Sequence, residues 1–181
     1  VLPHMDPVYT ISIIHTGMGA AGYTMPLPDN DEMFNTKNKM LEDITTLLGG
    51  RVAEEIIFGD ITTGASNDIK RATETARSMV MKYGMSEKIG LIAYGNDDDE
   101  VFIGRDLAHT RGYSEEVARE IDGEISRIIR ECHENAESII RENIGVLHSC
   151  AALLLEKEKI HREEFEALFT TEKEEVAKTN E

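Results

Sequence analysis

The sequence predicts a mainly α-helical domain with small antiparallel β elements and a C-terminal helical hairpin or bundle. Apolar residues recur at helical spacing over much of residues 36–58, 62–84 and 113–143. Short β-branched or aromatic runs, bounded by glycine or proline, lie near the N-terminus and near residue 90. At 181 residues, 40% of them hydrophobic, the chain is long enough for one well-packed domain and needs no second.

The first predicted strand is the run VYTISII at residues 8–14. AGYTMPLP, residues 21–28, offers a short antiparallel partner that ends at Pro26 and Pro28. Proline confines this partner to the edge of a sheet, where unpaired backbone groups can bind an extended peptide. An ordinary protected edge is the alternative interpretation.

Residues 36–58, TKNKMLEDITTLLGGRVAEEIIF, predict a helix with two unusual features. Gly49 and Gly50 lie in its interior, where each costs about 1 kcal/mol relative to alanine. Such a cost is tolerable if another backbone packs close to the pair. Arg51 and Glu55, four residues apart, fall on the apolar face, where an ion pair is expensive unless it is fully hydrogen-bonded.

Residues 62–84, TTGASNDIKRATETARSMVMKYG, predict a loop that leads into an amphipathic helix. Asp68 lies in the first turn of this helix, roughly 65° from the centre of the apolar stripe on a helical wheel. One explanation is capping, because a helix N-terminus favours negative charge and offers free N–H groups. The other is a functional carboxylate.

The C-terminal half predicts three further helices. Ser114 is the expected N-cap of a long helix that ends near residue 143, a second helix follows a break at Gly145, and a third covers residues 161–169. Before them, KIGLIAYG and EVFIG predict a short hairpin around the acidic loop NDDDE, which lacks the pattern of a calcium loop. We expect the polar tail, residues 171–181, to be disordered.

Composition excludes several classes of function. The 35 acidic residues against 19 basic ones give a net charge of −16, which argues against a nucleic-acid partner.

The spacing of the cysteines and histidines gives no sign of a disulfide or metal motif. Cys132 and Cys150 have no CxxC spacing and predict reduced core thiols. His133, His148 and His161 lack paired ligand spacing, so we expect surface or helix-end histidines. No run approaches 18 apolar residues, so we expect no membrane span in these 181 residues.

Two adjacent motifs carry a family resemblance. LLGGRVAEEIIFG, followed by TTGASNDIKRATETARSMVMKYGMSEKIG, resembles the peptidase domain of FtsH-type ATP-dependent zinc metalloproteases. GYTMPLP, VFIGRD and YSEEVAREID fit the same family in order and spacing, so the likeness covers residues 1–170. His15 departs from the proline expected in many relatives, outside the metal-binding segment.

The resemblance implies a zinc site. In that family two histidines of an HExxH helix and the aspartate of a TTGAxND segment hold Zn²⁺, and this aspartate corresponds to Asp68. The chain contains no HExxH, so it lacks two ligands and the glutamate that acts as general base. In relatives that helix comes immediately before the region equivalent to Val1. We therefore expect a truncated chain that is inactive and without zinc by itself.

The resemblance also suggests a cause for the unusual features of the helix over residues 36–58. Gly49 and Gly50 would let the HExxH helix pack closely. Glu54 or Glu55 could orient a ligating histidine as a hydrogen-bond acceptor. Arg51 bonded to Glu55 as core scaffolding is the alternative.

The implied activity is hydrolysis of unfolded polypeptides, whose backbone would add to the predicted edge strand. An ATP-binding module and a membrane anchor outside this chain, a homo-hexameric ring, and a location on the cytoplasmic side of a membrane or its organellar equivalent are also implied. The competing interpretation is a non-catalytic oligomerisation or interaction module of an FtsH-like ring. The residues expected to form the substrate edge are Ala21, Gly22, Tyr23, Thr24 and Met25.

Overall fold

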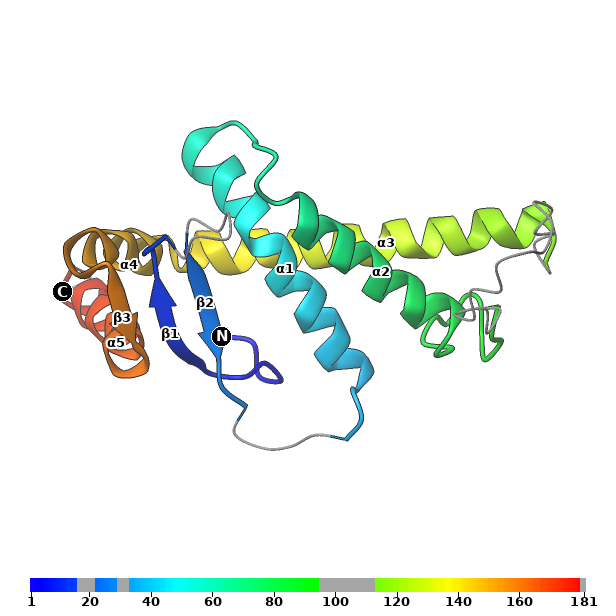
Figure 1. Ribbon diagram of the computed structural model, residues 1–181, viewed down its shortest axis with the longest axis horizontal. Coiled ribbons are helices and arrows are strands. Elements are labelled where there is room, and N and C mark those ends of the chain that lie inside the picture. The colour runs from blue at the N-terminus through cyan, green and yellow to red at the C-terminus, as the bar shows by residue number, and fades with distance from the viewer. Residues whose placement is uncertain (16–21, 29–32, 95–112, 180–181) are drawn as a thin grey trace. The chain divides into compact units, whose positions relative to one another are not determined.

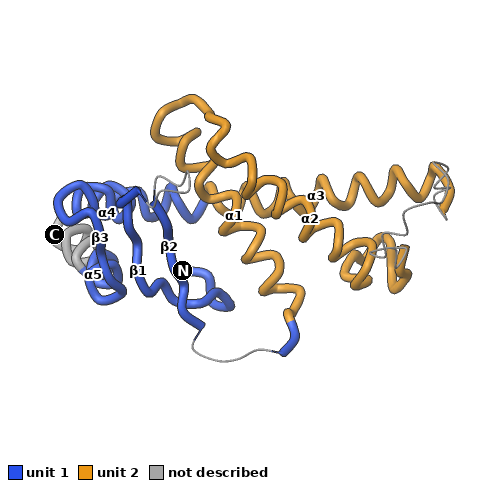
Figure 2. The backbone as a smooth tube through the Cα atoms, viewed as in Figure 1, with its two compact units in different colours: residues 1–34, 138–181 blue, residues 35–137 orange. Residues whose placement is uncertain are grey.

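The computed structural model describes residues 1–15, 22–28, 33–94 and 113–179, with side chains as far as residue 170. These residues form two compact units (Figure 2). One contains residues 35–137, and the other contains residues 1–34 and 138–181. The secondary structure is mainly helical with one small antiparallel sheet, which confirms the predicted fold class.

The larger unit is built from α1 (Lys37–Phe58), α2 (Ser66–Met81) and most of α3 (Glu115–Glu142) (Figure 1). The Thr36 hydroxyl caps α1 by accepting a hydrogen bond from the Lys39 N–H at 3.2 Å. The helix ends at Gly59, whose φ of 62° is left-handed and suits glycine. Both ends of α1 lie where the sequence predicts them.

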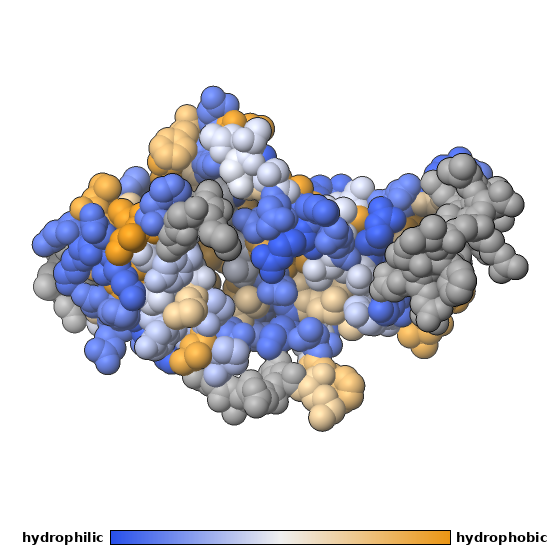
Figure 3. All heavy atoms as spheres, in the orientation of Figure 1, coloured by the Kyte–Doolittle hydropathy of each residue, from blue (hydrophilic) through white to orange (hydrophobic). Residues whose placement is uncertain are grey.

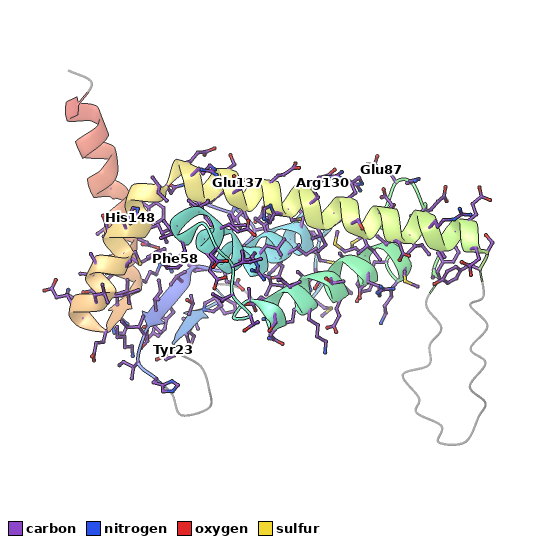
Figure 4. All side chains as sticks on the ribbon, turned by 90° about the horizontal axis from the view of Figure 1, so that it is seen from above. Tyr23, Phe58, Glu87, Arg130, Glu137 and His148 are labelled. Carbon is purple, nitrogen blue, oxygen red and sulfur yellow. The ribbon has the colours of Figure 1, made fainter. Side chains whose placement is uncertain are left out.

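The core of this unit lies where the three helices meet. The predicted apolar stripes supply it, because residues three and four apart share one helix face. The Cys132 thiol donates a hydrogen bond to the Leu41 carbonyl at 3.5 Å and so links α3 to α1. Arg130 projects from the solvent-facing side of α3 (Figure 4). The buried core residues are Met40, Ile44, Leu48, Ala72, Ala76, Met79, Val80, Ile89, Ile121, Ile125, Ile128 and Cys132.

The smaller unit contains a three-stranded antiparallel sheet in the order β2-β1-β3. The strands are β1 (Val8–Ser12), β2 (Tyr23–Pro26) and β3 (Lys159–His161). β2 is an edge strand, as its prolines predict. The sequence did not predict β3, which is only three residues long. The buried Thr10 hydroxyl of β1 donates to the Ile160 carbonyl at 3.0 Å.

Helices α4 (Ile144–Lys157) and α5 (Arg162–Thr179) pack against each other beside this sheet. Their apolar side chains form a second core around the buried Ile160 of β3. The predicted C-terminal hairpin of helices is therefore present. The other members of this core are Cys150, Leu154, Ile11, Leu153, Phe165 and Leu168.

Three predicted boundaries differ from the structure. The break before α4 lies at Asn143, so Gly145 falls inside the first turn of the helix. α5 continues through residues 171–179, where the sequence predicts a disordered tail. Residues 88–94 of the predicted second hairpin form a turn and coil instead of a strand. Its other half lies outside the described residues.

The turn at residues 88–94 has a local physical cause. The Ser86 hydroxyl accepts the Ile89 N–H at 3.2 Å, and Gly90 adopts a left-handed φ of 78°. This hydrogen bond and this backbone conformation reverse the chain before a strand can form.

In the described parts of the chain, no single helix has both the length and the apolarity to cross a membrane. The bent pair of α3 and α4 passes that test together, by length and composition only.

Candidate metal-binding segment and substrate edge

The loop between α1 and α2 carries the predicted metal-binding segment, and Glu54 holds it. The Glu54 carboxylate accepts the Thr62 N–H at 2.9 Å and the Thr62 hydroxyl at 2.7 Å. These two hydrogen bonds, the backbone one first, lower the pKa of the Glu54 carboxyl, and the nearby Arg51 charge adds to the effect. Glu54 is thus bound to the TTGAxND loop of this same chain.

Asp68 lies in the first turn of α2 with 46% of its side chain exposed. Its nearest basic partner is Arg71, whose Nη1 is 3.8 Å from Oδ1. Such exposed pairs contribute only about 0.2–1 kcal/mol, so an ion could replace this contact. Ala65 is the N-cap of α2 and provides no side-chain cap. The N-terminal turn of a helix favours a negatively charged side chain such as that of Asp68.

The alternative interpretation, in which Arg51 bonds to Glu55, is wrong. Arg51 Nη1 lies 3.9 Å from Glu54 Oε2, and Glu55 instead contacts His133 Nε2 of α3 at 3.1 Å. Glu55 is one residue further round the helix than Glu54 and so points toward α3. The Arg51 Nη1 atom is buried, and it has no hydrogen-bond partner among the described residues.

The two interior glycines of α1 have free space beside them in this unit. A Cβ atom at Gly49 or Gly50 would meet no described atom within 4 Å, apart from the local backbone of the helix. The expectation that another backbone packs against them stays a prediction. Ile57, Phe58 and Ile61 are exposed around the C-terminal end of α1. Phe58, which is 74% exposed, is labelled in Figure 4, and Figure 3 shows apolar surface at this end of α1.

The strand β2, which contains Tyr23, Thr24 and Met25 of the predicted substrate edge, is exposed along its whole length. Every residue of β2 is exposed, and its outer side pairs with no strand among the described residues. Gly22 precedes it, and a Cβ at this position would collide with the Ser12 carbonyl oxygen of β1. Glycine therefore permits the close approach of the two strands. Ala21 lies outside the described residues.

A buried polar network on α3 was missed by the sequence analysis. Glu124 is 5% exposed and accepts the Ser86 hydroxyl at 2.6 Å. Arg127 donates two hydrogen bonds to the same carboxylate, each at 3.0 Å. The Arg127 hydrogen bonds lower the pKa of the Glu124 carboxyl most, and the Ser86 hydroxyl lowers it further, against the opposing effect of burial.

The sequence held weak signals for the contacts that were missed. Glu124 lies next to Ile125 on the apolar side of α3, where a carboxylate needs a partner. Thr62 has no distinctive sequence signal, because its partner Glu54 lies eight residues earlier and is brought beside it by the end of α1. Only the fold reveals either pairing.

The described residues do not contain a complete metal site. The carboxylate of Asp68 is accessible and loosely paired, which fits one position of a zinc site. No group of three His, Cys, Asp or Glu side chains that could hold a metal occurs in the described parts of the chain. A complete site therefore needs donors beyond those described here.

Sequence comparison decides the family. The profile of peptidase family M41 matches residues 1–168. The chain belongs to peptidase family M41. Its M41 relatives include the ATP-dependent zinc metalloprotease FtsH 1 of Thermoanaerobacter sp., which is 54% identical over 172 residues, 95% of this chain and 28% of the relative.

Two further relatives of this M41 chain are also called ATP-dependent zinc metalloprotease FtsH. That of Caldicellulosiruptor bescii is 54% identical over 168 residues, 93% of this chain and 27% of the relative. That of Thermotoga maritima is 47% identical over 176 residues, 97% of this chain and 29% of the relative. The chain thus spans less than a third of each relative and corresponds to the peptidase domain of a zinc metalloprotease family.

Proposed function

We propose that this chain is the proteolytic domain of an ATP-dependent zinc metalloendopeptidase that degrades unfolded polypeptides, and that Asp68 is one of its zinc ligands. The exposed, loosely paired carboxylate of Asp68 at the start of α2 is the observation that carries the proposal. Bound zinc would supply a Lewis acid for the scissile peptide carbonyl. The chain itself would contribute a ligand, the loop that holds this ligand, and an edge strand for substrate.

The exposed edge of β2 supports a polypeptide substrate. An extended peptide could add beside Tyr23, Thr24 and Met25 through backbone hydrogen bonds, which depend little on side-chain identity. That mode of binding suits a protease that accepts many sequences. Specificity for one motif would need side-chain pockets in addition.

The whole enzyme is proposed from the relatives and from the family resemblance. It would be a homo-hexamer whose ATP-binding module and membrane anchor lie outside this chain, with the peptidase domain on the cytoplasmic side or its organellar equivalent. We further propose that the 181-residue chain alone does not hydrolyse protein, because it has no HExxH sequence to provide the other donors and the general base.

The second candidate is a non-catalytic oligomerisation or interaction module. The exposed apolar side chains of Phe58 and Ile61 favour it, because such residues are common at protein interfaces. This candidate predicts that Asp68 is dispensable for zinc binding and for proteolysis.

A chimera separates the two candidates. This chain replaces the matching segment of the Thermoanaerobacter relative, and casein hydrolysis and bound zinc are measured beside the 181-residue chain alone. The proposal expects zinc-dependent hydrolysis by the chimera, loss of both properties in Asp68→Asn, and retention of both in the control Asp122→Asn, which changes an exposed carboxylate of α3. An Asp68→Asn chimera that retains zinc and activity would favour the interaction module.

A further inference from the structure

We propose that Glu54 and Thr62 form a clamp that positions Asp68, so that Glu54 acts on the metal site through Thr62 and not as a ligand or as a partner of a ligating histidine. The inference rests on the proposed function, because it assigns a role relative to a zinc ligand. It concerns positioning residues only.

The contact between Glu54 and Thr62 fixes both the backbone and the side chain of one loop residue. Glu54 Oε2 accepts the Thr62 N–H at 2.9 Å, and Oε1 accepts the Thr62 hydroxyl at 2.7 Å. An ionised acceptor makes these bonds stronger than neutral ones. Glu54 lies on α1, so the loop is tied to a helix whose inner face is buried.

Further hydrogen bonds continue from the clamp to the first turn of α2. The Thr62 hydroxyl oxygen accepts the Gly64 N–H at 3.1 Å, and the Thr63 carbonyl accepts the Ser66 N–H at 3.1 Å. The buried Ala65 then accepts the Ile69 N–H at 3.0 Å. Asp68 lies within the turn that this last bond closes.

The glycine in the loop leaves room for this arrangement. A Cβ at Gly64 would lie 3.2 Å from the Thr62 hydroxyl oxygen and 3.7 Å from Glu54 Oε1. Its φ is not in the left-handed region, so close approach is the stereochemical reason for glycine here. The packing around Gly64 thus depends on the clamp.

Asp68 needs outside support because its own contacts are weak. No side chain caps α2, and the Arg71 contact at 3.8 Å leaves the carboxylate half exposed. A metal ligand must be held to within about 0.5 Å of its working position. In the described structure, the two hydrogen bonds of the clamp join the loop before α2 to α1.

The test compares Thr62→Val with Thr62→Ser. Thr62→Val removes the hydroxyl that donates to Glu54 and accepts the Gly64 N–H, whereas Thr62→Ser keeps it. Thr46→Val is the matched control, because the Thr46 hydroxyl donates to the Glu42 carbonyl at 2.9 Å in another part of α1. Amide hydrogen exchange is measured in the 181-residue chain. Zinc affinity is measured in the chimera by competition with a chelator.

The clamp predicts faster exchange at Gly64 and Ser66 in Thr62→Val, by about tenfold or more, together with about 10–100-fold weaker zinc binding. Glu54→Gln should act in the same direction. Thr62→Ser should restore both properties, and Thr46→Val should change neither. The Gly64 N–H loses its own acceptor in Thr62→Val, so the deciding readouts are Ser66 in Thr62→Val and Gly64 in Glu54→Gln. Unchanged exchange at these two sites, or normal zinc affinity despite faster exchange, would overturn the inference.

Asp68→Asn distinguishes failure of the clamp from failure of the proposed function. If the Asp68→Asn chimera retains zinc, Asp68 is not a zinc ligand, and the proposed function and the clamp both fail. If zinc is lost in Asp68→Asn but binds normally in Thr62→Val, only the clamp fails.

Discussion

Asp68 and Glu124, two carboxylates of the larger unit, each pair with the arginine three residues later on the same helix, yet their surroundings differ. Asp68 and Arg71 on α2 lie 3.8 Å apart, with 46% and 58% of their side chains exposed. Glu124 and Arg127 on α3 make hydrogen bonds of 3.0 Å, and the Glu124 side chain is 6% exposed. Ser86 completes the partners of Glu124.

The difference separates a structural carboxylate from an available one. Glu124 is buried and accepts three hydrogen bonds, so its carboxylate already has its hydrogen-bond partners inside the unit. Asp68 exposes half of its side chain and has one loose partner, so it can bind a group from outside. Equal spacing in the sequence therefore does not mean equal function.

The largest expected effects come from substituting the two carboxylates: Asp68 should control zinc affinity and Glu124 should control stability. In the chimera, Asp68→Asn should weaken zinc binding by at least about 100-fold, because a ligand is lost, and should change the free energy of unfolding by less than about 0.5 kcal/mol. Glu124→Ala should leave zinc affinity unchanged in any folded protein and cost about 1–3 kcal/mol of stability. Zinc titration and urea unfolding measure the two effects.

Substituting the arginine partner of each carboxylate should give smaller effects on stability that differ in the same direction. Arg127→Gln removes two hydrogen bonds from a buried carboxylate and should cost about 1–2 kcal/mol in urea unfolding. Arg71→Gln should cost about 0.5 kcal/mol or less, because its contact is long and exposed. Equal losses in the two variants would show that burial does not distinguish the pairs.

The smallest effect is a difference in pH dependence. The folded-state pKa of Glu124 is lowered by Arg127 and Ser86, so its stabilising contribution is fully present above the unfolded value of about 4.3 and is lost as pH falls through the folded value. Stability should therefore fall less below pH 4.3 in Glu124→Gln than in the unmodified chain. Urea midpoints between about pH 6 and pH 3 test this, and parallel curves would contradict it.

The helices could be predicted well because their signals are local. Thr36 and Gly59 mark the two ends of α1, and Ser114 caps α3 through the Val117 N–H at 3.3 Å. The spacing of apolar residues then assigns the buried faces. β3 could not be predicted, because three residues carry little strand signal and β1 pairs with them from far away in sequence.

The candidate site could be predicted only in part. The place of Asp68 in the first turn of α2 was predicted from the sequence and is confirmed, whereas its role as a zinc ligand comes from the family resemblance and stays a prediction. The contact of Glu54 with Thr62 could not be read from the sequence, because it depends on how α1 meets the following loop. Similarly, the contact between His133 and Glu55 forms only because α3 packs beside α1.

The most direct test of the central claim is an anomalous-diffraction map of the zinc-loaded chimera. The account predicts a zinc peak with a carboxylate oxygen of Asp68 about 2.0–2.2 Å away. A fully coordinated zinc ion whose ligands do not include Asp68, with that carboxylate still beside Arg71, would contradict it.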